Sequence, residues 1–252
     1  MIFPKPDHIR VKICGIRSVD VALACAGAGA DFLGYNFAPV SRRRIDPATA
    51  SRAIEALKAD GTRGSAPEAL PDHLQPTGHR PQSSSPFAVG IFVNQSAREI
   101  DDIARECELD IVQLSGTETP EECEDIADAT GLPLIKAVRL TSASDHDLIN
   151  AYGSLPNLFA LLADTPGTWG GTGAPWDYAT VRSLATTSTR RLFLAGGLTP
   201  ETVADAVHRA CPWGVDVASG VETNGVTDPA RVQSFIKSVR TRPIAPVASG
   251  EA

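Results

Sequence analysis

The feature that most constrains the fold is a regular alternation of short apolar runs with alanine-rich segments along the 252 residues. The apolar runs have the length of strands, and the segments between them have helical spacing. Alternation of this kind is typical of a parallel sheet with its helices outside. Strands are predicted at 11–14, 32–37, 87–93, 111–114, 134–138, 158–163, 191–194 and 214–217. Helices are predicted at 19–28, 47–58, 97–106, 120–130, 200–209 and 229–240.

Eight such units in a chain of this length favour a single-domain α/β fold, the (β/α)8 TIM barrel, over residues 1–252. A doubly wound open sheet is the alternative, but it leaves the last two units harder to place. Segment 60–86 is rich in Pro, Ser, Gly and Thr without apolar periodicity, so a disordered insertion is predicted there. The tail 241–252 is predicted to be flexible.

The composition argues against several classes of partner. A formal net charge of −7 is unusual for a nucleic-acid-binding protein. The five cysteines are odd in number and lack CxxC spacing, which argues against a disulfide framework or a zinc site and fits reduced thiols in a cytoplasm. Because neither a membrane-length apolar run nor a signal-peptide core is present, we expect a cytoplasmic protein that binds no membrane.

Two residues at predicted strand ends are candidates for proton transfer, because a barrel carries its active residues at the carboxyl ends of the strands. Cys14 ends the first strand, and Asp164 follows the sixth. A cysteine is more often a small buried apolar residue, and a strand-end aspartate can simply cap a turn. Lys12 lies on the same side of the strand as Cys14 and is expected to favour its thiolate.

Other strand-end loops carry groups suited to anions. Arg43 lies in a run of three arginines after the second strand, where a guanidinium can clamp a carboxylate, although such a run is usually a solvated face. Gly171, Gly197, Ser219 and Gly220 lie in small-residue turns after the sixth, seventh and eighth strands. Backbone N–H groups in such turns can point at a phosphate.

One more candidate lies within the eighth strand itself. Asp216 can orient neighbouring backbone or contact a substrate hydroxyl. We include it among the predicted substrate-binding residues.

Nine motifs then follow one another in the order of a known family over nearly the whole chain. They are Val-Lys-Ile-Cys-Gly-Ile (11–16), Ser-Arg-Arg-Arg-Ile (41–45), Gly-Ile-Phe-Val-Asn (90–94), Val-Gln-Leu-Ser-Gly (112–116), Ile-Lys-Ala-Val (135–138), Asp164 with Gly-Gly-Thr-Gly (170–173), Trp-Asp-Tyr (176–178), Leu-Ala-Gly-Gly-Leu-Thr-Pro (194–200) and Val-Asp-Val-Ala-Ser-Gly-Val-Glu (215–222). Together they make the sequence resemble the phosphoribosylanthranilate isomerases of tryptophan biosynthesis.

The resemblance implies a (β/α)8 barrel that converts N-(5-phosphoribosyl)anthranilate to 1-(2-carboxyphenylamino)-1-deoxyribulose 5-phosphate by an Amadori rearrangement. It implies that Asp164 is the general acid that opens the furanose ring and that Cys14 is the general base at C2. Arg43 would hold the anthranilate carboxylate. Phosphate would lie near Gly171 and the turns after the last two strands. No cofactor or metal is implied, and the one expected partner is the phosphorylated small-molecule substrate.

One residue departs from the family pattern, because Ser115 stands where the family commonly has His. Three other functions are weighed against the isomerase. A ribulose-phosphate epimerase-like barrel requires metal-binding His and Asp at strand ends, and a histidine-pathway isomerase requires Asp where this chain has Cys14. The third is a catalytically dead barrel kept as a binding module, which the presence of both Cys14 and Asp164 opposes. A monomer or weak homodimer is expected.

Overall fold

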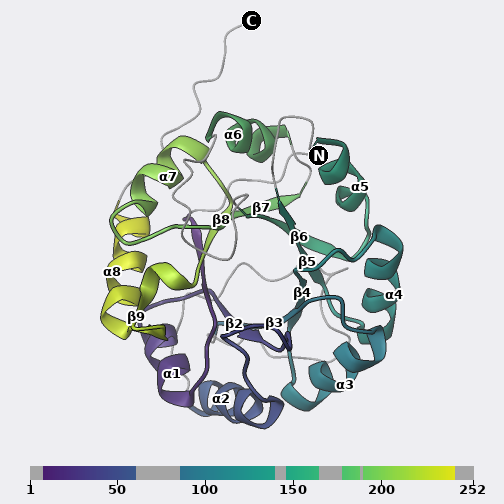
Figure 1. Ribbon diagram of the computed structural model, residues 1–252. Helices are drawn as coiled ribbons and strands as arrows, with labels where there is room; N and C mark the ends of the chain where they lie inside the picture. Colours follow the sequence, from purple (N-terminus) through teal and green to yellow (C-terminus); the bar gives the residue numbers. More distant parts are fainter. Residues whose placement is uncertain (1–7, 61–85, 140–145, 165–177, 188–189, 242–252) are drawn as a thin grey trace, which may run out of the picture.

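The eight predicted strands close into one parallel barrel with the helices outside it (Figure 1). The computed structural model describes residues 8–60, 86–139, 146–164, 178–187 and 190–241. The strands are β1 (Arg10–Cys14), β2 (Phe32–Asn36), β3 (Phe87–Phe92), β4 (Ile111–Leu114), β5 (Leu134–Arg139), β6 (Leu158–Asp164), β7 (Arg191–Leu194) and β8 (Gly214–Val217). Because β8 pairs with β1, the barrel prediction is confirmed and the open sheet is excluded.

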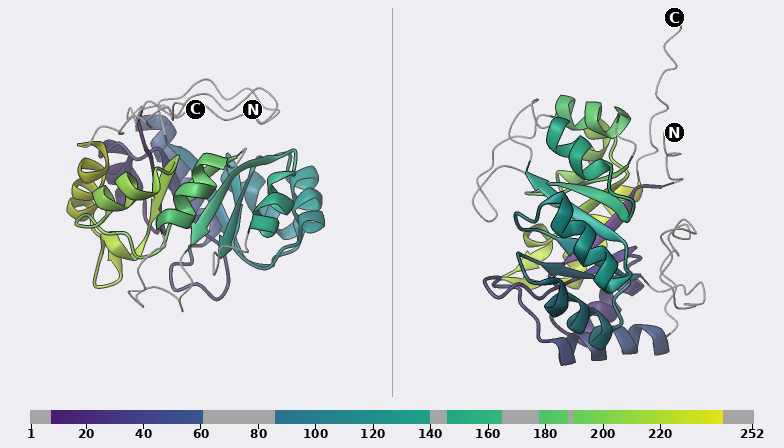
Figure 2. Two further views of the ribbon diagram at one scale, coloured as in Figure 1. Left: turned by 90° about the horizontal axis from the view of Figure 1, so that it is seen from above. Right: turned by 90° about the vertical axis from the view of Figure 1, so that its right-hand side faces the viewer.

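The helices form the outer layer of the ring, as two perpendicular views show (Figure 2). They are α1 (Val19–Gly27), α2 (Pro47–Asp60), α3 (Ala97–Cys107), α4 (Pro120–Thr130), α5 (His146–Gly153), α6 (Tyr178–Thr187), α7 (Val203–Ala210) and α8 (Pro229–Arg240). After β8 come a short 3-10 helix (Ser219–Val221) and the ribbon of β9 (Glu222–Thr223) and β10 (Val226–Thr227). Closure brings α8 against α1, so the first and last helices of the chain lie side by side.

Helix starts follow local chemistry in most of these elements. Ser96 and Thr119 each form a capping box with a glutamate three residues later, which satisfies backbone N–H groups that a helix start leaves unpaired. The predicted start of α7 at Pro200 is wrong. Residues 200–202 form a turn held by bonds between Thr199 and Thr202, and the helix begins at Val203. The sequence did not predict α5 and α6, which are two of the shorter helices.

Strand side chains alternate between two apolar cores. Outward residues such as Val11 and Leu33 pack with the helices in the larger core. Inward residues fill the lumen in a second cluster, which contains Phe32, Val89, Ile111, Ile135, Phe159, Ala160, Leu162, Phe193 and Ala195. This period of two is the geometry of an extended strand. It also decides which strand-end residues face the barrel axis.

Most of the predicted insertion and tail lie outside the described residues. Helix α2 continues through Asp60, and the structure describes the chain again from Pro86, so 61–85 are not described. The same holds for 242–252 of the tail. Within the described part of the chain, no helix is long and apolar enough to cross a membrane.

Candidate active site

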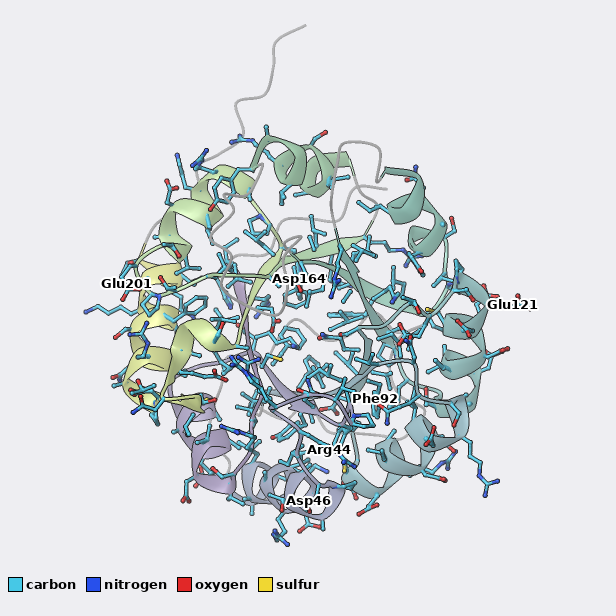
Figure 3. All side chains as sticks on the ribbon, viewed as in Figure 1. Arg44, Asp46, Phe92, Glu121, Asp164 and Glu201 are labelled. Carbon is cyan, nitrogen blue, oxygen red and sulfur yellow. The ribbon has the colours of Figure 1, made fainter. Side chains whose placement is uncertain are left out.

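The predicted site residues come together at the carboxyl ends of the strands. Figure 3 places Asp164 close to the barrel axis, whereas Glu121 and Glu201 lie at the outer rim. Cys14 ends β1 and Asp164 ends β6. Arg43 lies in the loop after β2. Gly171 falls outside the described residues, so its phosphate contact stays a prediction.

The loop after Cys14 is fixed to the neighbouring strand. The backbone amides of Gly15 and Ile16 both donate to the carbonyl of Gly34, at 2.9 and 3.0 Å. Cys14 itself pairs in register with Gly34 and is partly exposed. The residue therefore has a defined position at the carboxyl end of the barrel.

The pKa of the Cys14 thiol is raised to about 11, and burial is the largest cause. The positive charges of Lys12 and Arg43 lower the pKa, but they do not offset burial. The negative charges of Asp216 and Asp164 raise it further, which also places both carboxylates within electrostatic reach of the sulfur. Lys12 thus favours the thiolate, as predicted, but burial outweighs its effect and keeps the pKa of the thiol raised.

Lys12 also has a partner of its own. Its Nζ donates to Oδ1 of Asp216 at 2.9 Å, and both side chains are buried in the lumen. Gly34 leaves room for this ammonium, because a Cβ there would lie 3.1 Å from Nζ. Burial alone would lower the pKa of Lys12, but its contacts with Asp216 and Cys14 raise it. Asp216 thus has a structural bond that the sequence did not predict, and its predicted contact with substrate stays a prediction.

A cation that sequence reasoning missed stands beside Asp164. Arg139 ends β5 and pairs in register with Asp164. Paired residues of neighbouring strands point to the same face and lie ~4.8 Å apart. Arg139 is exposed. Strand alternation could have identified Arg139 from the sequence. Ile135 and Ala137 of the same strand face the lumen, and residues two apart on a strand share a face.

Arg43 is bound to a carboxylate from the other end of the chain. Its Nε donates to Oε1 of Glu222 at 2.5 Å, and its Nη2 donates to Oε2 at 3.0 Å. The pair lowers the pKa of Glu222 against the effect of burial and raises that of Arg43. The sequence motif contained Glu222 without assigning it a role, since nothing local connects it with Arg43.

The turns after β7 and β8 pack directly against each other. A Cβ on Gly220 would overlap the carbonyl oxygen of Leu198, so only glycine allows this approach. Gly197 has a positive φ of 66°. Within the described residues, no backbone hydrogen bond uses the amides of Gly197, Ser219 or Gly220 as donors. Their contact with phosphate stays a prediction.

Ser115 keeps the end of β4 regular. Its amide donates to the carbonyl of Phe92 at 2.9 Å, and its hydroxyl accepts from Nε2 of Gln113 at 3.0 Å. The departure from the family pattern therefore leaves the backbone in register with β3. Lys136, from another of the motifs, bonds Glu118 at 2.7 Å in a buried pair between β5 and the start of α4.

Comparisons with known proteins agree with this geometry. The family model described as N-(5'-phosphoribosyl)anthranilate isomerase matches residues 67–238. A relative of that name from Roseiflexus castenholzii is 40% identical, covering 91% of this chain and 97% of its own length.

Solved structures give the same result. The phosphoribosyl anthranilate isomerase of Thermotoga maritima superposes with a TM-score of 0.73 at 34% identity, covering 92% of this chain and 98% of that one. A phosphoribosyl anthranilate isomerase in complex with reduced 1-(o-carboxyphenylamino)-1-deoxyribulose 5-phosphate gives a TM-score of 0.70 at 33% identity over the same shares. The chain therefore belongs to the N-(5'-phosphoribosyl)anthranilate isomerase family.

Proposed function

We propose that this chain isomerises N-(5'-phosphoribosyl)anthranilate to 1-(2-carboxyphenylamino)-1-deoxyribulose 5-phosphate, with Asp164 as general acid and Cys14 as general base. The reaction serves tryptophan biosynthesis, as it does in the family to which the chain belongs. The observation that carries the assignment is the meeting of a carboxylate and a thiol at one barrel mouth, close enough for the charge of Asp164 to raise the pKa of Cys14.

The chemistry requires only proton transfers, so the atoms balance within one substrate molecule. Asp164 gives a proton to the furanose ring oxygen, and the C1–O bond breaks to leave a protonated Schiff base. Cys14 then removes the proton from C2, and the electron pair of that bond forms the enolamine. Tautomerisation of the enolamine gives the ketose. An acid and a base on different strands suit such a sequence, because the two protons leave or reach different atoms of the sugar.

The raised pKa of Cys14 fits a base that acts after ring opening. A thiol of pKa about 11 is mostly protonated near neutral pH. The Schiff base formed in the first step carries a positive charge next to it, which favours the thiolate. The same charge acidifies the C2 proton. Ring opening by Asp164 would therefore prepare both partners of the second proton transfer.

Substrate binding is assigned to the loops around this pair. Arg43 holds the anthranilate carboxylate, and Asp216 faces the sugar from β8. Phosphate binds the backbone of Gly197, Ser219 and Gly220, with Gly171 as the predicted contribution of the loop after β6. The support is that the loops after β7 and β8 pack together and that, within the described residues, these amides donate no backbone hydrogen bond. A monomer or weak homodimer stays the expectation for the assembly.

The test is an isomerase assay on the wild type and on Asp164→Asn. The substrate is generated in place from anthranilate and phosphoribosyl pyrophosphate with a transferase, and its fluorescence loss is followed. We expect turnover by the wild type and a loss of at least ~10²-fold in kcat for Asp164→Asn, since a general acid typically contributes ~10²–10⁴-fold.

Glu201→Gln serves as the matched control, because Glu201 lies at the outer rim of the barrel (Figure 3). It removes a carboxylate charge like Asp164→Asn and should leave kcat within twofold. A folded wild type with no activity above the spontaneous background would instead favour the histidine-pathway isomerase or the dead barrel. Near-normal activity of Asp164→Asn would move the acid to another residue.

A further inference from the structure

We propose that Glu222 is a positioning residue, which holds the guanidinium of Arg43 from the side so that its end-on edge, Nη1 and Nη2, meets the carboxylate of the substrate. The inference rests on the proposed function. It adds to that function the residue that selects which edge of Arg43 the substrate uses.

The hydrogen bonds define the edge that remains. Glu222 accepts from Nε and from Nη2, so the side-on fork of the guanidinium is occupied. A guanidinium has five N–H donors, and two are used here. Both hydrogens of Nη1 and one of Nη2 remain, and the side chain of Arg43 has no other hydrogen bond within the described residues. One N–H bond of Nη1 and one of Nη2 point in the same direction. Together they can donate to the two oxygens of a carboxylate.

The stem of Arg43 is held next to the catalytic thiol. A Cβ on Gly15 would lie 2.5 Å from Cδ of Arg43. The arginine side chain therefore packs directly on the backbone of the residue that follows Cys14. Gly15 also has a φ of 87°, a conformation that favours glycine. Two contacts therefore fix the side chain, one along its stem and one along its guanidinium. A carboxylate on the end-on edge would be held beside the base that removes the C2 proton.

Electrostatics allow Glu222 to orient Arg43 without cancelling the attraction for an anion. The carboxylate of Glu222 is also 3.6 Å from Nη2 of Arg42. Arg17, which donates to the carbonyl of Gly225 in the same loop, adds a third positive charge near it. Three cations thus surround one anion. The cluster keeps a net positive charge at the barrel mouth, while the one anion fixes the direction of the central arginine.

Glu222 is itself anchored by the chain around it. Val221 is fully buried, and Glu222 pairs in register with Thr227 in the small ribbon after β8. The same loop contains Gly220, which packs on the backbone after β7. The side chain of Glu222 is 5% exposed and that of Arg43 is 16% exposed, so water competes little for this pair. A rigid partner is what an orienting role requires.

The test compares two ligands that differ only in the carboxylate. One is reduced 1-(o-carboxyphenylamino)-1-deoxyribulose 5-phosphate, and the other is the same compound with an unsubstituted phenyl ring. Kd is measured by calorimetry for the wild type, Glu222→Gln, Glu222→Asp, Arg43→Ala and the Glu222→Gln/Arg43→Ala double variant. Melting temperature and circular dichroism report the fold.

We expect Glu222→Gln to raise the Kd of the carboxylated ligand ~10-fold or more, which is the scale of one lost charge-assisted hydrogen bond. Its Kd for the phenyl ligand should stay within twofold. In the Arg43→Ala background, Glu222→Gln should have no further effect, since nothing remains to be oriented. Glu222→Asp keeps the charge on a shorter side chain, so it should lie between the wild type and Glu222→Gln. It also serves as the second variant if Glu222→Gln does not fold.

Three results would overturn the role of Glu222. They are an equal loss for both ligands, an additive effect with Arg43→Ala, or no effect of Glu222→Gln on the carboxylated ligand. Failure of the proposed function has a different signature. A folded wild type would then bind neither ligand and would not turn over the substrate.

Discussion

The two ends of the barrel lumen receive inward side chains from the same eight strands, yet they contain opposite chemistry. At the amino end, the rings of Phe32, Phe159, Phe193 and Trp213 pack edge to face or tilted, with centroids 5.2–6.0 Å apart. At the carboxyl end, the lumen contains the Lys12–Asp216 pair, with Cys14 and Asp164 at the mouth. The difference fits a division in which one end stabilises the barrel and the other carries the proposed active site.

Carboxylates show the same division between the ends. Asp31 and Asp110 directly precede a strand, and each accepts the backbone N–H of a residue in a neighbouring strand, Val11 at 2.8 Å and Ala88 at 2.7 Å. Asp164 and Asp216 lie toward the other end, where their charges act on Cys14. Aspartates before the strands therefore hold backbone, whereas those toward the carboxyl ends act electrostatically on Cys14, although Asp216 also binds Lys12.

The largest expected effect at the carboxyl end belongs to Cys14→Ala. Loss of the general base should lower kcat ~10²–10⁴-fold while the melting temperature changes little. Cys211→Ala is the matched control, because Cys211 is also a partly exposed thiol but lies at the end of α7. Steady-state kinetics of both variants make the test. Similar kcat values for the two would remove Cys14 from the mechanism.

The corresponding change at the amino end is Phe193→Ala. Phe193 is fully buried and contacts Phe32 and Trp213, so its truncation should lower the free energy of unfolding by ~3–5 kcal/mol. Turnover per folded molecule should stay near that of the wild type, because the ring packs against Phe32 at the start of β2 and Trp213 just before β8. Urea unfolding and active-site titration measure the two quantities, and Phe193→Leu keeps the test possible if the alanine variant does not fold. A loss of kcat at unchanged stability would contradict the division between the ends.

The smallest expected effect is on the pH dependence of kcat/KM, which reflects the raised pKa of the buried Cys14 thiol. Since the thiol of the free enzyme has a pKa of about 11, its thiolate fraction rises tenfold per pH unit below that value. A general acid must be protonated and a general base ionised, so the gain in thiolate with rising pH is opposed by the loss of the protonated acid. We therefore expect kcat/KM of the wild type to vary little between pH 7 and 9. In Cys14→Ala the residual kcat/KM should fall with rising pH, because only the acid still titrates. A wild-type kcat/KM that rises with a slope near one on logarithmic axes would contradict the pairing of this base with a carboxylic acid.

Circular dichroism at each pH is the control for this profile. Cys25 and Cys123 are also buried, and burial raises their pKa to about 12 and about 11. An unfolded thiol ionises near pH 9, whereas these folded thiols remain protonated up to their raised pKa. The unfolded state therefore binds fewer protons in that interval, and stability falls as pH rises through it. Rates are compared only where the spectrum is unchanged.

The sequence by itself determined the barrel and the positions of the two proposed reacting groups. Strand and helix periodicity is a local property, so eight alternating units predicted eight parallel strands to within one or two residues at each end. The ends of those strands then located Cys14 and Asp164 in one ring. Helices α5 and α6 were not predicted, although α1 and α7 are of similar length, so length alone does not account for the difference.

Only the tertiary structure decided which charges meet. Arg43 and Glu222 are 179 residues apart, and Lys12 and Asp216 are 204 apart. The two pairs form because the last strand closes on the first, which brings the loops at the two ends of the chain together. The high pKa of Cys14 has the same origin, since desolvation depends on everything packed around the sulfur and not on its neighbours in the sequence.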